Sequence, residues 1–255
     1  MRNEQGIENA QDMQHRQSTR GRQGAQDALD TRRPVVSVRH AERADLDFLV
    51  QVMETAATSH LDRCCWEPLL GEGTEVTREI LRTLALSAGP HWCHLSRFWV
   101  AEVEGRTGPR RVGALTAYDP VAEGHAAVGE QCADLAASGG WPGTVPFENV
   151  RERQRIFQSC LPADYADSWG IENVAVVPEF RGAGVVDALL GHALELGRRQ
   201  GYACAQILCL DGNARAQRTW ERAGFEVRAS YRGREFEALI GAPGLKLLVR
   251  EYPPV

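Results

Sequence analysis

The spacing of hydrophobic residues predicts both helices and strands in the first half of the chain. The expected elements are a strand at 35–41, helices at 44–58 and 75–89, and strands at 97–105 and 110–119. The first strand alternates apolar and polar residues, whereas the helices repeat apolar residues every three or four positions. Asp45 is placed to cap the first helix and Gly89-Pro90 to end the second.

The second half continues the alternation after an irregular stretch. A strand is expected at 169–177, a helix from the following turn to about 199, a strand at 204–210, a helix at 213–224, and strands at 226–232 and 245–252. The resulting order, βαα-βββ-αβαββ, predicts an α/β fold with a mixed, largely antiparallel central sheet flanked by helices.

Two segments depart from this pattern. Residues 1–34 are polar and have almost no large apolar residues, so a disordered tail is expected before a domain spanning 35–255. Residues 121–168 are rich in Gly, Ala and Pro, and only 147–161 read as helical. We interpret this long insertion as an excursion over an active site, with a disordered insertion as the alternative.

The turn after the strand at 169–177 is the strongest chemical signal. Pro178 ends the strand, and Arg181-Gly182-Ala183-Gly184 leads directly into a helix. Glycines allow a ligand to approach the unpaired N–H groups of a helix N-terminus, where the helix dipole favours an anion such as pyrophosphate. The turn is neither of two common phosphate loops: no Lys-Ser/Thr pair follows it, and Asp187 occupies the place of a third glycine.

The composition excludes several classes of binding partner and of cellular location. The 255 residues carry a net charge of −5, which disfavours nucleic acid or an anionic membrane as partner. No apolar run reaches the roughly 20 residues of a membrane span, and the N-terminus has no signal-peptide pattern, so a cytoplasmic protein is expected. The seven irregularly spaced cysteines fit reduced thiols. A metal-dependent hydrolase is a weaker rival, because no C-x-x-C or helical His pair organises the candidate ligands Cys64, Cys65, His91, Cys93 and His94.

Two segments together resemble a known family. ENVAVVPEFRGAGVVDALL, residues 172–190, resembles the acetyl-coenzyme A signature of the GNAT superfamily of N-acetyltransferases. NARAQRTWERAGFEV, residues 213–227, resembles the second conserved helix of that superfamily. The resemblance covers about 169–227 and extends to 35–120 by the order of elements only.

The resemblance implies a cofactor site. In the family the signature strand splays from its neighbour, and the pantetheine arm of coenzyme A pairs with its backbone, here Val174, Ala175 and Val176. Asn213 matches a position near the reactive end of the cofactor. The pyrophosphate would be held by the backbone of Arg181, Gly182, Ala183, Gly184, Val185 and Val186.

Glu172 is the expected general base. Strict alternation along the strand places Glu172, Val174 and Val176 on one face, beside the groove of the thioester. An amine with a pKa near 10 is protonated at neutral pH, so its proton must be removed before attack. A backbone N–H of Val174 or Ala175 would stabilise the oxyanion.

Two positions depart from the family pattern. Val186 replaces a small residue in the turn, and Trp220 stands where many members carry a tyrosine acid. Indole cannot act as an acid, so Tyr202, Tyr231 or water would have to protonate the leaving thiolate, unless the thiolate leaves unaided.

These features predict an acyltransferase that moves an acetyl group from acetyl-CoA to a primary amine of a small molecule by direct attack. The insertion would close over this acceptor through Trp141, Asp164, Tyr165, Asp167 and Trp169. A homodimer through 226–252 is one arrangement that this fold allows. The alternative is a coenzyme A-binding regulatory or scaffold module without catalysis, which Trp220 favours and Glu172 opposes.

Overall fold

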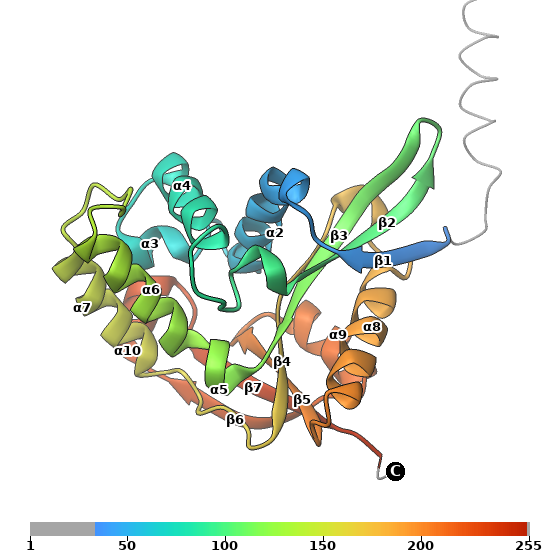
Figure 1. Cartoon of the computed structure of the whole chain (residues 1–255). Helices are drawn as coiled ribbons and strands as arrows, with labels where there is room; N and C mark the ends of the chain where they lie inside the picture. The colour runs from blue at the N-terminus through green and yellow to red at the C-terminus, as the bar shows by residue number, and fades with distance from the viewer. Residues whose placement is uncertain (1–33, 254–255) are drawn as a thin grey trace, which may run out of the picture. The chain divides into compact units, whose positions relative to one another are not determined.

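Seven strands form one sheet in the computed structural model, which describes residues 34–253 (Figure 1). The order across the sheet is β1-β2-β3-β4-β5-β7-β6, and only β4 and β5 are parallel neighbours. The strands are β1 Val36–His40, β2 Phe98–Gly105, β3 Gly108–Tyr118, β4 Ser168–Val176, β5 Cys204–Leu210, β6 Glu226–Arg232 and β7 Gly244–Glu251. The predicted mixed, largely antiparallel sheet is confirmed. The predicted tail at 1–34 lies outside the described residues except for Pro34.

Helices cover both faces of the sheet. The α-helices are α2 Leu46–Thr58, α3 Trp66–Leu70, α4 Thr74–Ala85, α5 Pro120–Glu123, α6 His125–Ala137, α7 Phe147–Gln158, α8 Val185–Arg199, α9 Ala214–Arg222 and α10 Arg234–Ile240. Short 3-10 helices are η1 Arg43–Asp45, η2 Leu95–Arg97 and η3 Pro178–Phe180. Apolar residues of α8 and α9 form one core with one face of the sheet, whereas α2, α3 and α4 build a second core against the other face.

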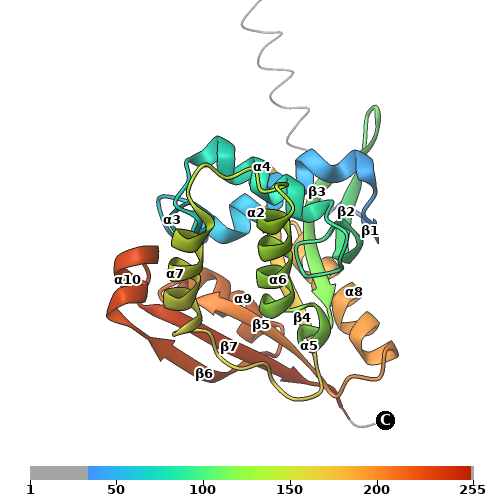
Figure 2. The same ribbon diagram turned by 60° about the vertical axis from the view of Figure 1, so that its left-hand side comes forward.

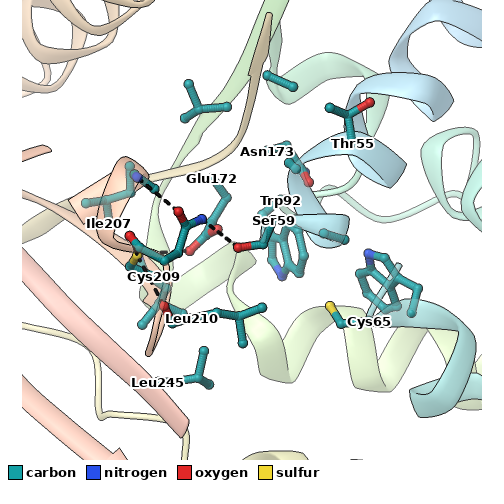
Figure 3. A pocket seen from close by; sticks show the side chains of 18 of the residues that line it. Thr55, Ser59, Cys65, Trp92, Glu172, Asn173, Ile207, Cys209, Leu210 and Leu245 are labelled. Atoms are coloured by element: carbon teal, nitrogen blue, oxygen red, sulfur yellow. Dashed lines mark hydrogen bonds between the residues drawn. The ribbon is translucent and has the colours of Figure 1, made fainter. Parts of the chain in front are cut away.

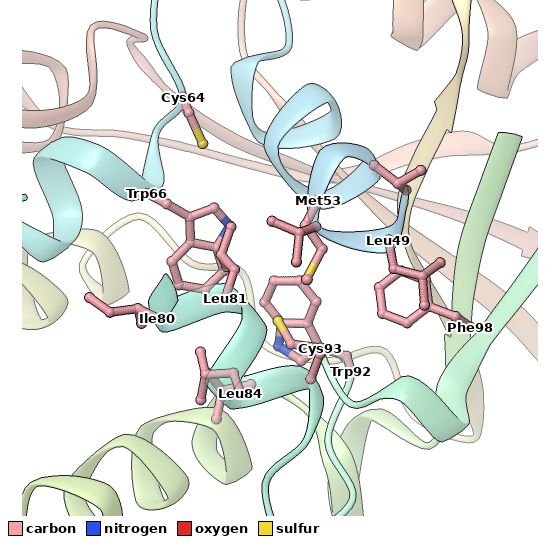
Figure 4. Close-up of a cluster of buried hydrophobic side chains, with 14 of the residues drawn as sticks. Leu49, Met53, Cys64, Trp66, Ile80, Leu81, Leu84, Trp92, Cys93 and Phe98 are labelled. Carbon is pink, nitrogen blue, oxygen red and sulfur yellow. The ribbon is translucent and has the colours of Figure 1, made fainter. Parts of the chain in front are cut away.

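The α2 side of the core follows the predicted helical spacing. Leu49 and Met53 of α2 and Leu81 and Leu84 of α4 are fully buried, and they belong to the same core cluster as Phe98 of β2 (Figure 4). Residues three or four apart lie on one helix face, so the apolar repeat read from the sequence is the buried stripe. However, α4 ends at Ala85, before the expected stop at Gly89-Pro90, because Leu86 leaves the helical region.

The insertion is folded. Figure 2 shows α6 and α7 side by side in front of the sheet, with α5 leading out of β3. The predicted helix at 147–161 corresponds to α7, and the alternative of a disordered insertion is wrong. Helix α6 was not predicted, because it buries only Val128 and Cys132 and so has no apolar repeat. The short helices α3 and α10 were also not predicted.

Asp45 forms a buried ion pair instead of the predicted helix cap. Its carboxylate does not cap α2 but is almost fully buried, where it binds the guanidinium of Arg39 at 2.7 Å and that of Arg111 at 3.2 Å. It also accepts the backbone N–H of Glu42. Burial by itself would raise the pKa of Asp45, but these hydrogen bonds and charges together lower it. Asp45 therefore fixes the start of α2 against β1 and β3.

Replacing Asp45 by Asn tests this buried ion pair. At pH 7 we expect the free energy of unfolding to fall by about 3 kcal/mol, because two arginines lose their buried partner. The folded pKa lies below the ordinary 3.8, so this contribution is complete above pH 3.8 and is lost as the pH falls through the folded pKa. Urea denaturation of both proteins across this range measures the difference. Asp47→Asn, at an exposed position, is the control and should change stability by less than about 0.5 kcal/mol. An equal effect of the two changes would contradict this assignment.

Candidate active site

The site begins where β4 and β5 part. Their parallel register runs from Ser168 opposite Cys204 to Ile171 opposite Ile207 and then stops. On its other side β4 stays paired with β3 as far as Val176. The backbone of β4 beyond Ile171 is therefore unpaired on the β5 side, which opens a groove in the middle of the sheet. This is the splay that the family resemblance implied.

A β-bulge at Asn173 shapes this groove. Ala114 and Thr116 of β3 lie opposite Ala175 and Glu172, so β4 contains one extra residue. Asn173 has a φ of 52°, in the left-handed region that asparagine tolerates better than most residues. The bulge shifts the alternation of side chains by one position. Asparagine within an apolar strand was the available sequence signal for this irregularity.

The predicted common face of Glu172, Val174 and Val176 is consequently wrong. Val174 and Val176 pack with Ile171 against the α8 side, whereas Ala175 belongs to the core on the α2 side. The extra residue places Glu172 on the α2 side as well. Glu172 nevertheless lines the groove, because it lies at the point where the two strands separate.

The peptide groups of β4 alternate between its two neighbours. Val177 donates its N–H to the carbonyl of Val112 on the β3 side. Successive peptide groups of a strand point in opposite directions, so we expect Val176 and Val174 to direct theirs into the groove. Ala175, on this alternation, directs its own towards β3.

Glu172 is held in an environment that favours its protonated form. Its Oε1 accepts the N–H of Leu208 at 3.3 Å, just past the last paired residue of β5. Burial is the main cause that raises the pKa of Glu172 from 4.5 to about 8, and the charge of Asp164 adds to it. The hydrogen bond from Leu208 acts in the opposite direction. A carboxyl with this pKa exchanges its proton near neutral pH.

The glycine turn leaves a helix N-terminus open. Gly182 and Gly184 have φ values of 82° and 88°, and a Cβ at either would meet no atom within 4 Å. Gly184 precedes α8, whose first turn has no side-chain cap. The glycines are thus required by the backbone conformation, and the space in front of them is empty of protein. Arg181 lies exposed beside this space and also lines the groove.

One cavity of about 350 Å³ connects these features. One part of it is lined by the cofactor candidates Val174, Ala175, Val176, Arg181, Val186 and Asn213, with Arg215, Ala216, Thr219 and Trp220 of α9. The other part is lined by α2, α3, α6 and α7 and the loop that carries Trp92. In Figure 3, Glu172 and Ser59 lie between Ile207 and Cys209 on one side and Trp92 and Cys65 on the other. Glu172 thus stands at the junction of the two parts.

The side chain of Asn213 links two elements that line the cavity. Its Oδ1 accepts the N–H of Ala216 and so caps α9, while its Nδ2 donates to Ser59 Oγ at 2.6 Å. Ser59 follows α2 and has a φ of 55°. This contact joins elements that are 154 residues apart in the chain. Of the predicted cofactor residues, Gly182, Ala183, Gly184 and Val185 form the turn without lining the cavity itself.

Comparisons with known proteins agree with this geometry. The model of the acetyltransferase (GNAT) family matches residues 151–225, which run from α7 through β4, the glycine turn and β5 to the end of α9. This segment of the chain is therefore similar to the GNAT acetyltransferase domain. No curated protein sequence matches it significantly.

Solved structures share the fold of this chain beyond the matched residues. A crystal structure of an acetyltransferase aligns with a TM-score of 0.57 at 15% identity, covering 85% of this chain and 100% of that one. SsHAT aligns with a TM-score of 0.57 at 18% identity, covering 87% and 100%. An N-acetyltransferase from Staphylococcus aureus Mu50 aligns with a TM-score of 0.54 at 14% identity, covering 84% and 99%. At these identities the likeness concerns the fold alone.

Trp220, which replaces the family tyrosine, lines the cavity, whereas the two tyrosines considered as substitutes do not. Trp220 is buried, lines the cavity, and its Nε1 has no hydrogen-bond partner among the described residues. Tyr202 packs on Trp169 at 5.0 Å between ring centroids, and Tyr231 is exposed on β6. Neither tyrosine lines the cavity.

The residues that the insertion contributes to the cavity differ from those predicted. The insertion does contribute, but through His125, Val128, Gly129, Gln154, Phe157, Gln158 and Leu161. The expected closing residues Trp141, Asp164, Tyr165, Asp167 and Trp169 do not line the cavity. Asp164 and Tyr165 instead bind the side chain of Gln206. Trp66 and Trp92 also line the cavity but were not predicted to do so. Their only signal in the sequence was a large aromatic residue that follows two cysteines in one case and a Gly-Pro pair in the other.

The Cys and His residues named for a metal serve other contacts. His91 binds Ser87 Oγ at 2.9 Å and accepts the N–H of Cys93. All seven cysteines are free thiols, and within residues 34–253 no group of three or more His, Cys, Asp or Glu could hold a metal ion. None of the described helices is long and apolar enough to cross a membrane.

Glu172→Gln tests the electrostatics of the site without any ligand. The folded pKa of about 8 lies above the ordinary 4.5, so wild-type stability is complete below pH 4.5 and falls as the pH rises to about 8. The glutamine variant has no proton to lose, and its stability relative to wild type should rise by about 1–3 kcal/mol across this window. Chemical denaturation at several pH values measures the difference. A pH-independent difference would show that Glu172 ionises normally.

Proposed function

We propose that the protein transfers an acetyl group from acetyl-CoA to the primary amine of a small molecule by direct attack. The observation that carries this proposal is the place of Glu172, where the part of the cavity that leads to the glycine turn before α8 meets the part lined by α2, α3, α6 and α7. One part of the cavity suits a long polyanionic cofactor, and the other a compact acceptor. A carboxyl able to exchange a proton near neutral pH lies where they meet.

The cofactor would follow the groove between β4 and β5. The unpaired peptide groups of Val174 and Val176 would bind the pantetheine arm as an added strand would. The open N–H groups from Gly182 to Val186 would bind the pyrophosphate, helped by the dipole of α8 and the charge of Arg181. Val186 does not obstruct this contact, because only its backbone is needed. Asn213 would stand near the thioester, with its amide held by Ser59 and Ala216.

Glu172 would remove the proton of the acceptor ammonium, directly or through a water. A carboxylate of ordinary pKa is a weak base towards an amine of pKa near 10, and a pKa of about 8 narrows this gap. The neutral amine then attacks the thioester carbon, the C–N bond forms, the C–S bond breaks, and the second amine proton passes to the departing thiolate directly or through water. The N–H of Val174 or Val176 would stabilise the oxyanion in between.

The leaving thiolate needs no strong acid. A thiol pKa near 8.5 makes the thiolate a tolerable leaving group without an acid. Two cysteines line the cavity, but burial raises the pKa of Cys209 to about 11 and raises that of Cys65 further. They remain thiols at neutral pH, which supports direct transfer rather than an acyl-cysteine intermediate.

The seven free thiols support a reducing, cytoplasmic setting for the protein. The exposed edge strand β6 supports a homodimer through 226–252, which light scattering of the purified protein would detect. A coenzyme A-binding module without catalysis is the second candidate. It is favoured only by Trp220, which stands where many members of the family carry a tyrosine. Release of free thiol from acetyl-CoA in the presence of an amine separates the two.

Gly184→Asp tests the cofactor position. The side chain would bring strain at a φ of 88° and a negative charge to the phosphate site, so the Kd for CoA should rise at least about tenfold. Calorimetry measures this affinity. Gly201→Asp is a matched control, since Gly201 has a φ of 90° and open surroundings at the opposite end of α8. Unchanged affinity in Gly184→Asp would place the pyrophosphate elsewhere.

Glu172→Gln tests proton transfer. Wild-type kcat/KM should rise with pH through an apparent pKa near 8, as the carboxylate forms. At pH 7–8 the variant should be slower by about a hundredfold. The loss should shrink as the pH approaches the pKa of the amine, because free amine then needs no base. A constant loss across the pH range would indicate positioning rather than base catalysis.

A further inference from the structure

Ser59 and His60 form a hydrogen-bonded pair where α2 ends. Ser59 lines the cavity, and its Oγ lies 3.2 Å from His60 Nδ1. Asn213 Nδ2 donates a hydrogen bond to the same oxygen at 2.6 Å, from the start of α9. Figure 3 shows Ser59 and Glu172 together between β5 and Trp92. The hydroxyl of Ser59 therefore lies at the junction of the two parts of the cavity.

The backbone of Ser59 is strained. Its φ of 55° and ψ of −113° lie outside the regions that L-residues ordinarily adopt, whereas glycine would adopt them freely. Strain of this kind persists where the surrounding contacts impose it, and it is concentrated at active sites and ligand clamps. The chain thus carries a hydroxyl at a conformational cost at the point where α2 meets the cavity.

The loop between β5 and α9 holds the Ser59–His60 pair. Gly212 has a φ of 101°, and a Cβ at this position would come within 2.8 Å of His60 Nε2, so a side chain there would displace the imidazole. The next residue, Asn213, caps α9 and binds Ser59. Asp211, just before them, is buried and forms ion pairs with basic side chains of β6 and β7. The loop is therefore anchored to the sheet, and it fixes the hydroxyl before any ligand binds.

The hydroxyl of Ser59 keeps bonding capacity for a ligand. A serine hydroxyl donates one hydrogen and accepts at two lone pairs. The amide nitrogen of Asn213 can only donate, so it occupies one lone pair. His60 Nδ1 takes either the hydrogen or the second lone pair, according to its own protonation, in a longer and exposed contact. A ligand that displaces this contact meets one donor and one acceptor on a fixed oxygen.

Two other hydroxyls line the cavity, but neither meets the junction. Of the described lining residues, only Thr55, Ser59 and Thr219 carry a hydroxyl. Thr219 donates its hydrogen to a carbonyl one turn earlier in α9. Thr55 lies one turn of α2 before Ser59, away from Glu172 in Figure 3. Ser59 is therefore the hydroxyl that is available to the reacting groups.

We propose that Ser59 is a catalytic residue that carries the second amine proton to the departing sulfur. Its hydroxyl takes the place of water in this transfer: the proton on the nitrogen of the tetrahedral intermediate passes to Ser59 Oγ, the Ser59 hydrogen passes to sulfur, and the C–S bond breaks. The hydroxyl ends as it began, so no further reactant is consumed. This inference rests on the proposed acetyl transfer and assigns its leaving-group side, where Trp220 replaces the family tyrosine. Asn213 and His60 are positioning residues, because they act through Ser59.

Ser59→Gly tests the contact with sulfur without any acceptor. A hydroxyl that donates to the sulfur of bound CoA stabilises the thiolate, so the CoA thiol should ionise about one pH unit higher in the variant than in wild type. The ultraviolet absorbance of the thiolate measures this midpoint, with the complex of desulfo-CoA as the baseline. Thr58→Ala is the matched control, because the hydroxyl of Thr58 donates to the carbonyl of Glu54 and does not line the cavity. Its midpoint should equal that of wild type, and Glu172 is common to all three proteins. Equal midpoints in all three would overturn the proposal.

The leaving group separates proton transfer from simple positioning. Hydroxylamine serves as the acceptor, because it is small and mostly neutral at pH 7 and so makes no demand on a base. With acetyl-CoA, Ser59→Gly should lower kcat/KM at least about tenfold, a modest loss for an acid catalyst because a thiolate also leaves unaided. With the selenoester analogue of acetyl-CoA the loss should shrink to about twofold or less, because a selenolate is less basic and needs no proton. Formation of acetohydroxamate above the rate without enzyme measures both. Equal losses with the two donors would show that Ser59 only positions the cofactor.

The outcomes distinguish this inference from the proposed function. Equal midpoints or equal losses overturn the role of Ser59 and leave acetyl transfer intact. If wild type forms no acetohydroxamate, the thiol titration alone decides, since it needs no acceptor. Thermal unfolding shows whether each variant is folded, and Ser59→Ala replaces Ser59→Gly in both measurements if the glycine variant is not. A protein that does not bind CoA in calorimetry would refute the proposed function, and this inference with it.

Discussion

The parting of β4 from β5 is the constraint on which the rest of the site depends. Two parallel strands normally continue their ladder, and breaking it leaves backbone groups without partners. Here the register stops at Ile171 and Ile207, the bulge at Asn173 bends β4 away, and Glu172 accepts the next N–H of β5. The carboxylate therefore satisfies one group that the separation exposes. The same position buries it, which raises its pKa into the range useful for proton exchange.

The two parts of the cavity present different groups to a ligand. The part beside the glycine turn presents main-chain groups and a helix N-terminus, so few side chains there have to be specific beyond the glycines of the turn. The other part is lined by the aromatic rings of Trp66, Trp92, His125 and Phe157.

The insertion supplies one side of the cavity through α6 and α7. Helices α6 and α7 bury few large residues of their own, and they pack through His125 and Phe157 onto rings from distant segments. Their contribution is thus to complete a wall rather than to build a core. The contact of Asn213 with Ser59 has a similar effect on the other side, because it fixes the end of α2 to the start of α9.

The sequence by itself determined the order of most elements, the sheet class and the glycine turn. These follow from local rules: apolar spacing sets a helix or strand, and a left-handed φ before α8 requires Gly184. It also placed Glu172 at the groove, although by an alternation that the bulge breaks. Only the tertiary structure decided which residues line the rest of the cavity. Trp66, Trp92, His125 and Phe157 lie in unrelated elements without periodicity, and their neighbourhood arises from long-range packing that no local pattern encodes.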